Sequence, residues 1–365
     1  MSQDLRNKTV LVTGATSGIG RETAFALARL GATVILACRN VDAAKQVAQE
    51  IREQVSGAEV VIPGPLDLAK PESIHRFVSH YRQQKYSCNI LVNNAGAAYR
   101  REWYTDEGVA GLTQVNYHGP YILTRLLEPV LIASKPSRVV NVASVEHRIG
   151  YIKDIRKFMF DAKKFLYSET KLGNVLLTYE HQRRLGPYGV QSCAVDPGAV
   201  RSSIWKRAGP IMQWVANHLF APNEDGCQTV VHAATAAWEP APEASAAAAE
   251  QKTSLRFYAR GLFTSPLLTS ISWQSAAVNK PKFMLWRVVL SIHGMIDYPV
   301  RHLSGGLFAS ETVLVPSSVQ TYDEKAYHAS ILAESITYET FCYYNPSTSA
   351  QASMMCNDPS QPPKL

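Results

Sequence analysis

A tyrosine and a lysine, Tyr167 and Lys171, stand four positions apart, and Ser144 precedes the tyrosine by 23 residues. Residues four apart share one face of a helix, so both side chains can act on one site. A lysine ammonium favours the phenolate and lowers the pKa of a tyrosine from its ordinary value of about 10. Such a tyrosine can supply a proton to a carbonyl oxygen that gains negative charge while a serine hydroxyl holds it. The three residues therefore predict acid–base chemistry at a carbonyl or alcohol group.

Each of these residues has a plainer interpretation when it is taken alone, as a surface residue, a turn or a helix cap. A glycine cluster far upstream decides between the interpretations. It reads Thr-Gly-Ala-Thr-Ser-Gly-Ile-Gly over residues 13–20, between an apolar run and a helical pattern. Glycines at 14, 18 and 20 let the backbone turn tightly and approach a pyrophosphate. The helix that follows offers unpaired N–H groups and the positive end of its dipole to the same group.

The elements that must position these residues follow from an alternation of short apolar runs with longer segments of helical periodicity. The predicted strands cover residues 9–12, 33–36, 60–62, 89–92, 138–142 and 191–195. The predicted helices cover residues 21–30, 41–55, 72–81, 108–133 and 168–186. This order predicts an α/β fold with a doubly wound parallel sheet, the Rossmann fold.

Composition excludes several other classes of protein. The 365 residues include 46% hydrophobic residues, too many for a disordered chain, and the net charge of +7 comes without any long basic run. We therefore expect no nucleic-acid partner.

The six cysteines contain no CxxC pair, which predicts neither a disulfide framework nor a metal site and favours a reducing compartment. We see no signal, transit or membrane-spanning segment, so we expect a cytoplasmic location or the cytosolic face of a membrane.

Further motifs at the ends of the later predicted strands resemble those of the short-chain dehydrogenase/reductase family, in the family's order and over about residues 8 to 200. The family's turn is Thr-Gly-xxx-Gly-Ile-Gly, its Asn-Asn-Ala-Gly motif matches residues 93–96, and Tyr167-xxx-Lys171 matches its Tyr-xxx-Lys. The resemblance implies an oxidoreductase acting on CH–OH groups with a nicotinamide cofactor. The residues expected to contact the cofactor are Gly14, Ser17, Gly18, Ile19, Gly20, Asp67, Leu68, Asn94, Ala95, Gly96, Tyr167, Lys171, Pro197 and Gly198.

The resemblance also implies individual roles in catalysis. Ser144, Tyr167, Lys171 and Asn116 form the expected catalytic set. Lys171 would also bind the nicotinamide ribose, Asn116 would hold a water in a proton relay, and Asp67 would lie against the adenine ring.

The 23-residue separation of Ser144 and Tyr167 is longer than in the commonest members of the family. It resembles the retinol-dehydrogenase-like branch, as do the phrases at residues 36–39, 171–176 and 196–201. A plant oxidoreductase in the same neighbourhood is also similar, and the motifs do not separate the two. The substrate therefore stays open among retinol- or retinal-like, steroid-like and other lipophilic alcohols, aldehydes and ketones.

The end of the second predicted strand distinguishes NADP(H) from NAD(H). An acidic residue there would bind the ribose 2′-hydroxyl and repel a 2′-phosphate. This strand ends in Arg39-Asn40, with no acid before Asp42, and an arginine can pair with a 2′-phosphate. We therefore expect NADP(H), with NAD(H) and a solvated Arg39 as the alternative. Arg21 either adds to the positive field or stays at the surface.

The pattern becomes less regular after about residue 205. We expect a catalytic domain over residues 1–240, an insertion over 241–305, a closing strand and helix over 306–345, and a disordered tail over 346–365. Residues 201–219 fit either a lid over an apolar substrate or ordinary core packing. Residues 283–296 are apolar with basic flanks, which fits a membrane contact, a buried helix or the face of a homodimer.

The sequence thus predicts an NADP(H)-dependent oxidoreductase that interconverts an alcohol and a carbonyl on a small lipophilic substrate. The alternative from another class is a non-catalytic nucleotide-binding scaffold or redox sensor. Four intact residues, Ser144, Tyr167, Lys171 and Asn116, favour the enzyme, because a scaffold does not need all of them.

Overall fold

The computed structural model describes residues 4–98, 103–152, 154–161, 166–202, 204–205, 209–236, 256–259 and 309–312. Within these ranges, eight strands form one sheet in the order β3-β2-β1-β4-β5-β6-β7-β8. The strands are β1 (Thr9–Thr13), β2 (Thr33–Ala37), β3 (Val60–Val61), β4 (Ile90–Asn93), β5 (Ser137–Val142), β6 (Val190–Asp196), β7 (Arg256–Ala259) and β8 (Ala309–Thr312). Neighbouring strands are parallel except for β8, which pairs antiparallel with β7.

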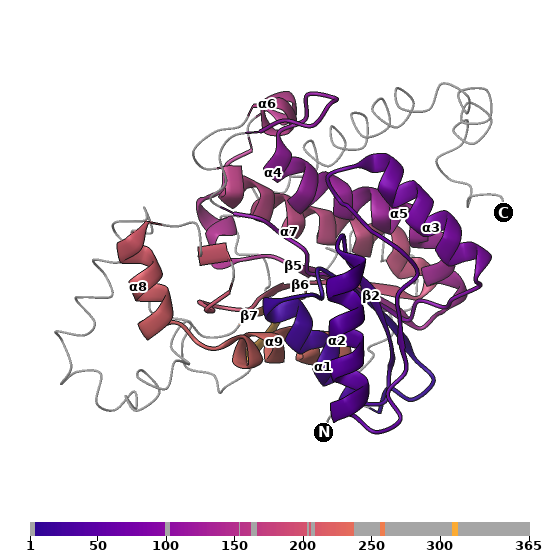
Figure 1. Ribbon diagram of the computed structural model, residues 1–365. Helices are drawn as coiled ribbons and strands as arrows, with labels where there is room; N and C mark the ends of the chain where they lie inside the picture. Colours follow the sequence, from indigo (N-terminus) through magenta and orange to yellow (C-terminus); the bar gives the residue numbers. More distant parts are fainter. Residues whose placement is uncertain are drawn as a thin grey trace, which may run out of the picture. The chain divides into compact units, whose positions relative to one another are not determined.

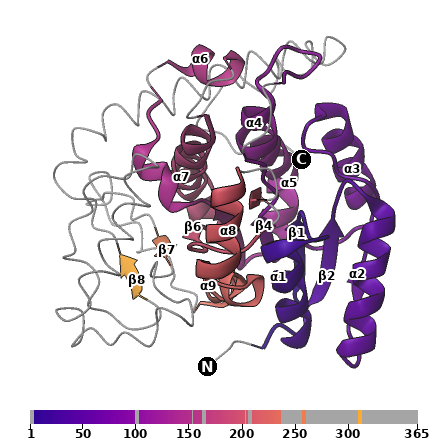
Figure 2. The same ribbon diagram turned by 60° about the vertical axis from the view of Figure 1, so that its left-hand side comes forward.

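Helices cover both faces of the sheet, so the predicted α/β doubly wound fold is confirmed (Figure 1). Helices α1, α2 and α9 lie on one face and α3, α5 and α7 on the other (Figure 2). The helices are α1 (Gly18–Arg29), α2 (Val41–Gln54), α3 (Pro71–Gln83), α4 (Gly111–Thr113), α5 (Gly119–Ala133), α6 (Ile155–Phe160), α7 (Leu166–Leu185), α8 (Pro210–Leu219) and α9 (Asn223–Thr235), with short helical turns η1 (Gln114–His118), η2 (Val145–Ile149) and η3 (Gly186–Tyr188).

The central strands form because both of their faces are buried by helices. Along β1, Val10 and Val12 belong to one apolar cluster with α1, α2 and α9, whereas Leu11 belongs to the cluster with α3 and α5. Successive side chains of a strand point to opposite faces, so a strand covered on both sides is a continuous apolar run. These runs are the signal that predicted the strands from the sequence.

The strand order places a crevice beside β1. Strand β1 pairs with β2 on one side and with β4 on the other, so the chain crosses over between β3 and β4. In open α/β sheets, ligands bind outside the carboxyl ends of the strands at such a reversal of strand order. The glycine turn follows β1 and the Asn94–Gly96 segment follows β4, so both meet at this crevice.

Two local features differ from the sequence-based expectation. The helix expected over 108–133 is three pieces in the structure, α4, the π-helical turn η1 and α5. Helix α6 stands in the charged stretch between Ser144 and Tyr167, where no helix was expected. Its Asp154 cap accepts hydrogen bonds from the N–H groups of Arg156 and Lys157.

The C-terminal third is described only in short pieces. Strand β7 lies within the range expected as an insertion, and β8 lies within the range expected to close the domain. The segment 283–296 and the expected tail lie outside the described residues. In the part of the chain that the structure describes, no helix combines the length and the apolar character that crossing a membrane requires.

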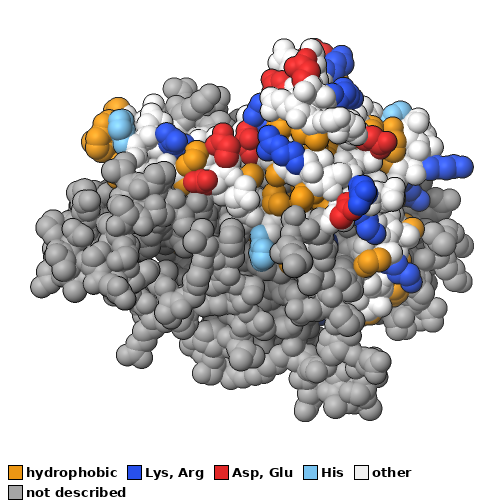
Figure 3. Space-filling view, turned by 90° about the horizontal axis from the view of Figure 1, so that it is seen from below, with side chains coloured by type: hydrophobic (Ala, Val, Ile, Leu, Met, Phe, Trp, Pro, Cys, Tyr) orange, Lys and Arg blue, Asp and Glu red, His pale blue; other side chains and the backbone are white. Residues whose placement is uncertain are grey.

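The outer surface of the described residues mixes charges of both signs. Lys, Arg, Asp and Glu side chains are interspersed on the face shown in Figure 3. Exposed local pairs occur among the described residues, such as Lys45 with Asp42 at 3.0 Å.

Candidate active site

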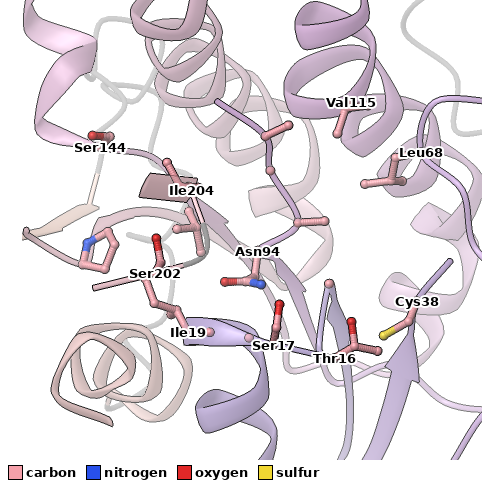
Figure 4. A pocket seen from close by; sticks show the side chains of 18 of the residues that line it. Thr16, Ser17, Ile19, Cys38, Leu68, Asn94, Val115, Ser144, Ser202 and Ile204 are labelled. Atoms are coloured by element: carbon pink, nitrogen blue, oxygen red, sulfur yellow. The ribbon is translucent and has the colours of Figure 1, made fainter. Parts of the chain in front are cut away.

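A cavity of about 1040 Å³ opens at the carboxyl edge of the sheet and gathers residues from the segments that follow β1, β2, β4, β5 and β6 and from α7. Every residue that the sequence proposes for the site lines it, apart from Asn116. These are Gly14, Ser17, Gly18, Ile19, Gly20, Arg39, Asp67, Leu68, Asn94, Ala95, Gly96, Ser144, Tyr167, Lys171, Pro197 and Gly198. Ser144 stands at one end of the cavity and Ser17, Thr16 and Cys38 at the other, with Asn94 between them (Figure 4).

The glycine turn presents the start of α1 to the cavity. Gly14 has a φ of +67°, in the left-handed region that favours glycine, and a Cβ there would lie 2.9 Å from the Cα of Ala95. Ser17 is the residue before the helix, and its side chain makes no capping hydrogen bond. The hydroxyl of Ser17 and the N–H groups of the first turn of α1 can therefore bind an anionic group.

Thr13 fixes the segment after β4 against the glycine turn. Its buried hydroxyl accepts the backbone N–H groups of Asn94 and Ala95, both at 3.0 Å, and donates to the carbonyl of Val92 at 3.3 Å. The Asn94 side chain in turn donates to the carbonyl of Thr13 at 2.9 Å. One hydroxyl thus holds two loops in register where both line the cavity.

Arg39 lies exposed at the end of β2, on the rim of the cavity. Among the described residues Arg39 has no ion pair. The nearest acid along the chain, Asp42, pairs with Lys45 at 3.0 Å instead. Arg21 does not line the cavity. Its guanidinium pairs with Glu22 and Glu50, both at 2.5 Å, which neutralises its charge locally.

Asp67 and Leu68 form the wall opposite the glycine turn. The carboxylate of Asp67 accepts the N–H of Ala69 at 3.0 Å, and the backbone N–H of Asp67 donates to Ser73 at 3.0 Å. The Gln114 side chain donates to the carbonyl of Leu68 at 2.9 Å. The π-helical turn η1 therefore supports this wall through Gln114.

Ser144 follows β5 and caps the short helix η2. Its Oγ accepts the backbone N–H of Glu146 at 3.3 Å. A hydroxyl has one donor and two acceptor positions, so this bond leaves the Ser144 O–H free to donate. Ser144 can therefore donate a hydrogen bond to an oxygen in the cavity.

Tyr167 and Lys171 lie on one face of α7, as their spacing predicted. The Nζ of Lys171 is 5.5 Å from the centre of the Tyr167 ring and donates to the carbonyl of Val142 at 2.8 Å. Lys171 is only 4% exposed, and burial lowers the pKa of its ammonium to about 8, although the charges of Glu146 and Asp196 oppose the shift. At neutral pH the ammonium is present and electrostatically strong.

Asn116 lies behind the cavity wall, in η1. Its side chain donates to the carbonyl of Ala97 at 2.8 Å and accepts the N–H of Ala97 at 2.7 Å. It also donates to Thr170 at 3.1 Å, between Tyr167 and Lys171 on α7. These bonds fix the segment after β4 to the helix that carries the tyrosine, and the expected place of Asn116 in a proton relay stays a prediction.

Several lining residues were not identified from the sequence. Among these are Trp103, Val115 and Glu146. Ser202, Ile204 and Trp205, which also line the cavity, belong to the segment 201–219 weighed as a lid. The Trp205 indole donates to the carbonyl of Val200 at 2.8 Å. The rest of that segment is mixed, since Ile211 and Trp214 are exposed and Val215 is buried. Neither Trp103 nor Val115 belongs to a motif with recognisable spacing.

A nicotinamide dinucleotide fits the residues present. A Cβ on Gly96 would lie 3.6 Å from the Oδ1 of Asn116 and 3.6 Å from the Nζ of Lys171, so this glycine keeps open the space in front of both. The glycine turn and Ser17 would hold the pyrophosphate, Asp67 and Leu68 the adenine end, and Lys171 a ribose hydroxyl. Fold and cavity together define a dinucleotide-binding oxidoreductase of the doubly wound α/β class.

Comparisons with known proteins give the family. The sequence profile described as "short chain dehydrogenase" matches residues 8–211. Human retinol dehydrogenase 12 is 38% identical over 239 residues, which are 64% of this chain and 74% of that protein. Human retinol dehydrogenase 11 is 37% identical over 234 residues, 63% of this chain and 73% of that protein. A metagenomic short-chain oxidoreductase solved in complex with NADP has a TM-score of 0.50 and 27% identity, covering 64% of this chain and 94% of that one.

The chain belongs to the short chain dehydrogenase family, and its relatives place it in the retinol-dehydrogenase-like branch. It is an NAD(P)-dependent oxidoreductase that acts on CH–OH groups and interconverts alcohols and carbonyls.

Proposed function

We propose that the protein uses NADP(H) to interconvert an alcohol and a carbonyl on a small lipophilic substrate, with Tyr167 as the acid–base residue. The observation that carries the proposal is the shared cavity. Ser144, Tyr167 and Lys171 line it together with the glycine turn and Arg39, and Ser144 lies at the end away from Ser17 and Cys38 (Figure 4). The dinucleotide supplies the hydride when it is bound, and the protein supplies binding, orientation and the proton.

The proton chemistry rests on the three side chains of Ser144, Tyr167 and Lys171. In the reduction, the Ser144 O–H donates to the substrate oxygen, because its acceptor side is already bonded to the Glu146 N–H. Tyr167 gives its phenolic proton to the oxygen as negative charge develops there. Lys171 stabilises the resulting phenolate with an ammonium that burial keeps out of water. In the oxidation the same groups act in reverse, and Tyr167 takes the proton from the alcohol.

The substrate class is proposed from the lining of the cavity and from the relatives. Trp103, Val115, Ile204 and Trp205 give the cavity an apolar, partly aromatic wall. Such walls favour an apolar substrate that carries few polar groups. The relatives named as retinol dehydrogenases support an elongated lipophilic alcohol or aldehyde.

The preference for NADP(H) is proposed from Arg39. An exposed guanidinium at the end of β2, without an ion pair among the described residues, can pair with a 2′-phosphate. The similar short-chain oxidoreductase in complex with NADP supports this choice. Residues 38–41, between the end of β2 and Asp42, include no acidic side chain. A carboxylate that would bind the ribose 2′-hydroxyl and favour NAD(H) is therefore missing from this segment.

The test compares NADPH and NADH binding to the wild type, Arg39→Ala and Lys45→Ala, followed by nicotinamide fluorescence. Lys45 is the matched control, because it is an exposed cation on the neighbouring helix that does not line the cavity. We expect Arg39→Ala to weaken NADPH binding about 10- to 100-fold, the loss of one charge-assisted contact, and to leave NADH binding unchanged. Lys45→Ala should leave both affinities unchanged.

Turnover completes the test. The wild type should reduce long-chain aldehydes with NADPH, and Tyr167→Phe should bind NADPH normally and lose turnover by about 100-fold or more. A wild type that binds NADH more tightly than NADPH contradicts the cofactor assignment. A wild type that binds neither nucleotide overturns the proposed function. A wild type that binds NADPH without turning over any aldehyde favours the nucleotide-binding scaffold.

A further inference from the structure

A third ionisable group, besides Tyr167 and Lys171, lines the cavity close to Ser144. Glu146 stands two residues after Ser144, in η2, and its side chain is partly buried. Its backbone N–H donates to the Ser144 Oγ at 3.3 Å, and its Oε2 accepts the hydroxyl of Ser168 at 3.0 Å. One residue thus contacts the candidate substrate-binding serine through its backbone and α7 through its carboxylate.

The partner of the Glu146 carboxylate, Ser168, is a buried residue of α7. It is 2% exposed and directly follows Tyr167 on α7. A buried hydroxyl needs a partner, and a carboxylate is a strong acceptor for it. The bond therefore joins the segment after β5, which carries Ser144, to the helix that carries Tyr167 and Lys171.

The carboxylate of Glu146 also acts on the charge of Lys171. Burial lowers the pKa of the Lys171 ammonium to about 8, and the carboxylates of Glu146 and Asp196 both oppose that fall. Asp196 ends β6 and already accepts the N–H of Gly198 at 3.0 Å. Tyr167 faces Lys171 from their common helix, and the ring of His147 is turned to the carbonyl of Ser144 at 2.6 Å.

We propose that Glu146 is a positioning residue of the site, whose carboxylate couples the Ser144 segment to α7 and places a negative charge within electrostatic range of the Tyr167–Lys171 pair. This role rests on the proposed function, because it acts through the acid–base pair. It assigns Glu146 two separable effects. The hydrogen bond to Ser168 sets the geometry of Ser144 relative to Tyr167, and the charge sets the pH at which the pair titrates.

Removal of the Glu146 charge should shift the titration of Tyr167 and Lys171 in one direction, toward lower pH. An anion raises the pKa of a neighbouring phenol and also that of a neighbouring ammonium. Tyr167 and Lys171 titrate as a coupled pair, so both apparent steps should move to lower pH when the anion is lost. We expect Glu146→Gln, which keeps the shape of the side chain, to lower both steps by about 1 pH unit.

The experiment follows phenolate absorbance against pH without substrate or nucleotide. Subtraction of the same curve for the Tyr167→Phe form of each protein isolates the titration of Tyr167. Glu146→Asp keeps the charge and Ser168→Ala keeps the whole carboxylate, so both should titrate as the wild type does. Glu53→Gln removes an exposed carboxylate on α2 and is the control for the same chemical change elsewhere.

The pH profile of aldehyde reduction is the second readout. It should shift in the same direction in Glu146→Gln and stay in place in Ser168→Ala, whose kcat should fall several-fold through the lost geometry. A Glu146→Gln titration that coincides with that of the wild type overturns the role of Glu146, whatever its activity. A wild type without any turnover overturns the proposed function instead, and with it the positioning role.

Discussion

Burial changes Lys171 and Cys38 in opposite ways, although both side chains line the same cavity. It lowers the pKa of the Lys171 ammonium to about 8, because the charged form loses solvation. It raises the pKa of the Cys38 thiol to about 11, although the N–H groups of Ala15 and Thr16 favour the thiolate. At neutral pH the cavity therefore holds an ammonium and a neutral thiol. Lys171 is poised for acid–base work, whereas Cys38 is a poor nucleophile.

The pKa of Lys171 predicts the alkaline limit of activity. The ammonium is present below its pKa and is lost above it, so kcat/KM for NADPH should fall as pH rises through about 8, by about tenfold per pH unit at the limit. Lys171→Arg keeps a positive charge at all these pH values and should move the fall to higher pH. Steady-state rates between about pH 6 and pH 10 measure both profiles. An alkaline fall at the same pH in Lys171→Arg would show that another group titrates.

At the scale of elements, the site depends on how the ends of neighbouring strands are held together. Thr13 at the end of β1 accepts two N–H groups from the segment after β4 and is 1% exposed. Asn93 at the end of β4 donates to Asn141 on β5 at 2.8 Å, and Asn141 donates to Thr178 on α7 at 2.9 Å. These buried bonds transmit the geometry of the sheet to the side chains of the cavity.

Thr13→Val tests this connection with almost no change of volume. It should lower the free energy of unfolding by about 1–3 kcal/mol, because the N–H of Ala95 loses its partner and the N–H of Asn94 keeps only the carbonyl of Val92. Denaturant unfolding measures the loss, and NADPH affinity should fall with it. Thr33→Val makes the same change where the hydroxyl bonds to the exposed Glu59, and should cost less than about 0.5 kcal/mol. Equal losses in the two variants would contradict the argument.

The sequence predicts these elements unequally well, for physical reasons. Strands β1, β2 and β4 are continuous apolar runs because helices bury both of their faces, and this signal is local. The π-helical turn η1 leaves no such signal, because it follows from tertiary bonds such as that of Asn116 to Ala97. Helix α6 is short and packs through Phe158 and Met159, which no periodicity reveals in six residues.

The residues of the candidate site also differ in how well the sequence predicts them. Residues in motifs of fixed spacing, such as Gly14, Tyr167 and Lys171, could be proposed from the sequence because each motif requires one geometry. Trp103 enters the cavity wall because Gly111 leaves room for its indole, where a Cβ would overlap the ring. Such a pair depends on how the segment at Trp103 packs against the start of α4, so it has no sequence spacing to recognise. Glu146 is known as part of the site through its place in the cavity lining and its contacts with Ser144 and Ser168, none of which a sequence spacing reveals.

At the scale of the whole molecule, the cavity is shared by segments far apart in the chain. Its lining runs from Gly14 to Trp205 and includes the segments that directly follow five strands, β1, β2, β4, β5 and β6. The sheet is also joined to a covering helix away from the site. There the buried Arg138 on β5 donates to the carbonyls of Ala233 and Ala236 at the end of α9, at 2.7 and 3.1 Å. A ligand in the cavity therefore contacts elements that must all be folded at once.

That coupling predicts a large stabilisation by NADPH. A ligand at 100 times its Kd adds about 2.7 kcal/mol to the free energy of unfolding, which raises the Tm of a domain of this size by about 5–10 °C. Gly96→Ala is the matched variant. Its Cβ would make ordinary contacts at 3.6 Å with Asn116 and Lys171, so the protein should keep its Tm without nucleotide. The same methyl group occupies space in front of Lys171, so the variant should lose most of the NADPH-induced shift in a thermal melt. An undiminished shift in Gly96→Ala would place the nucleotide elsewhere in the cavity.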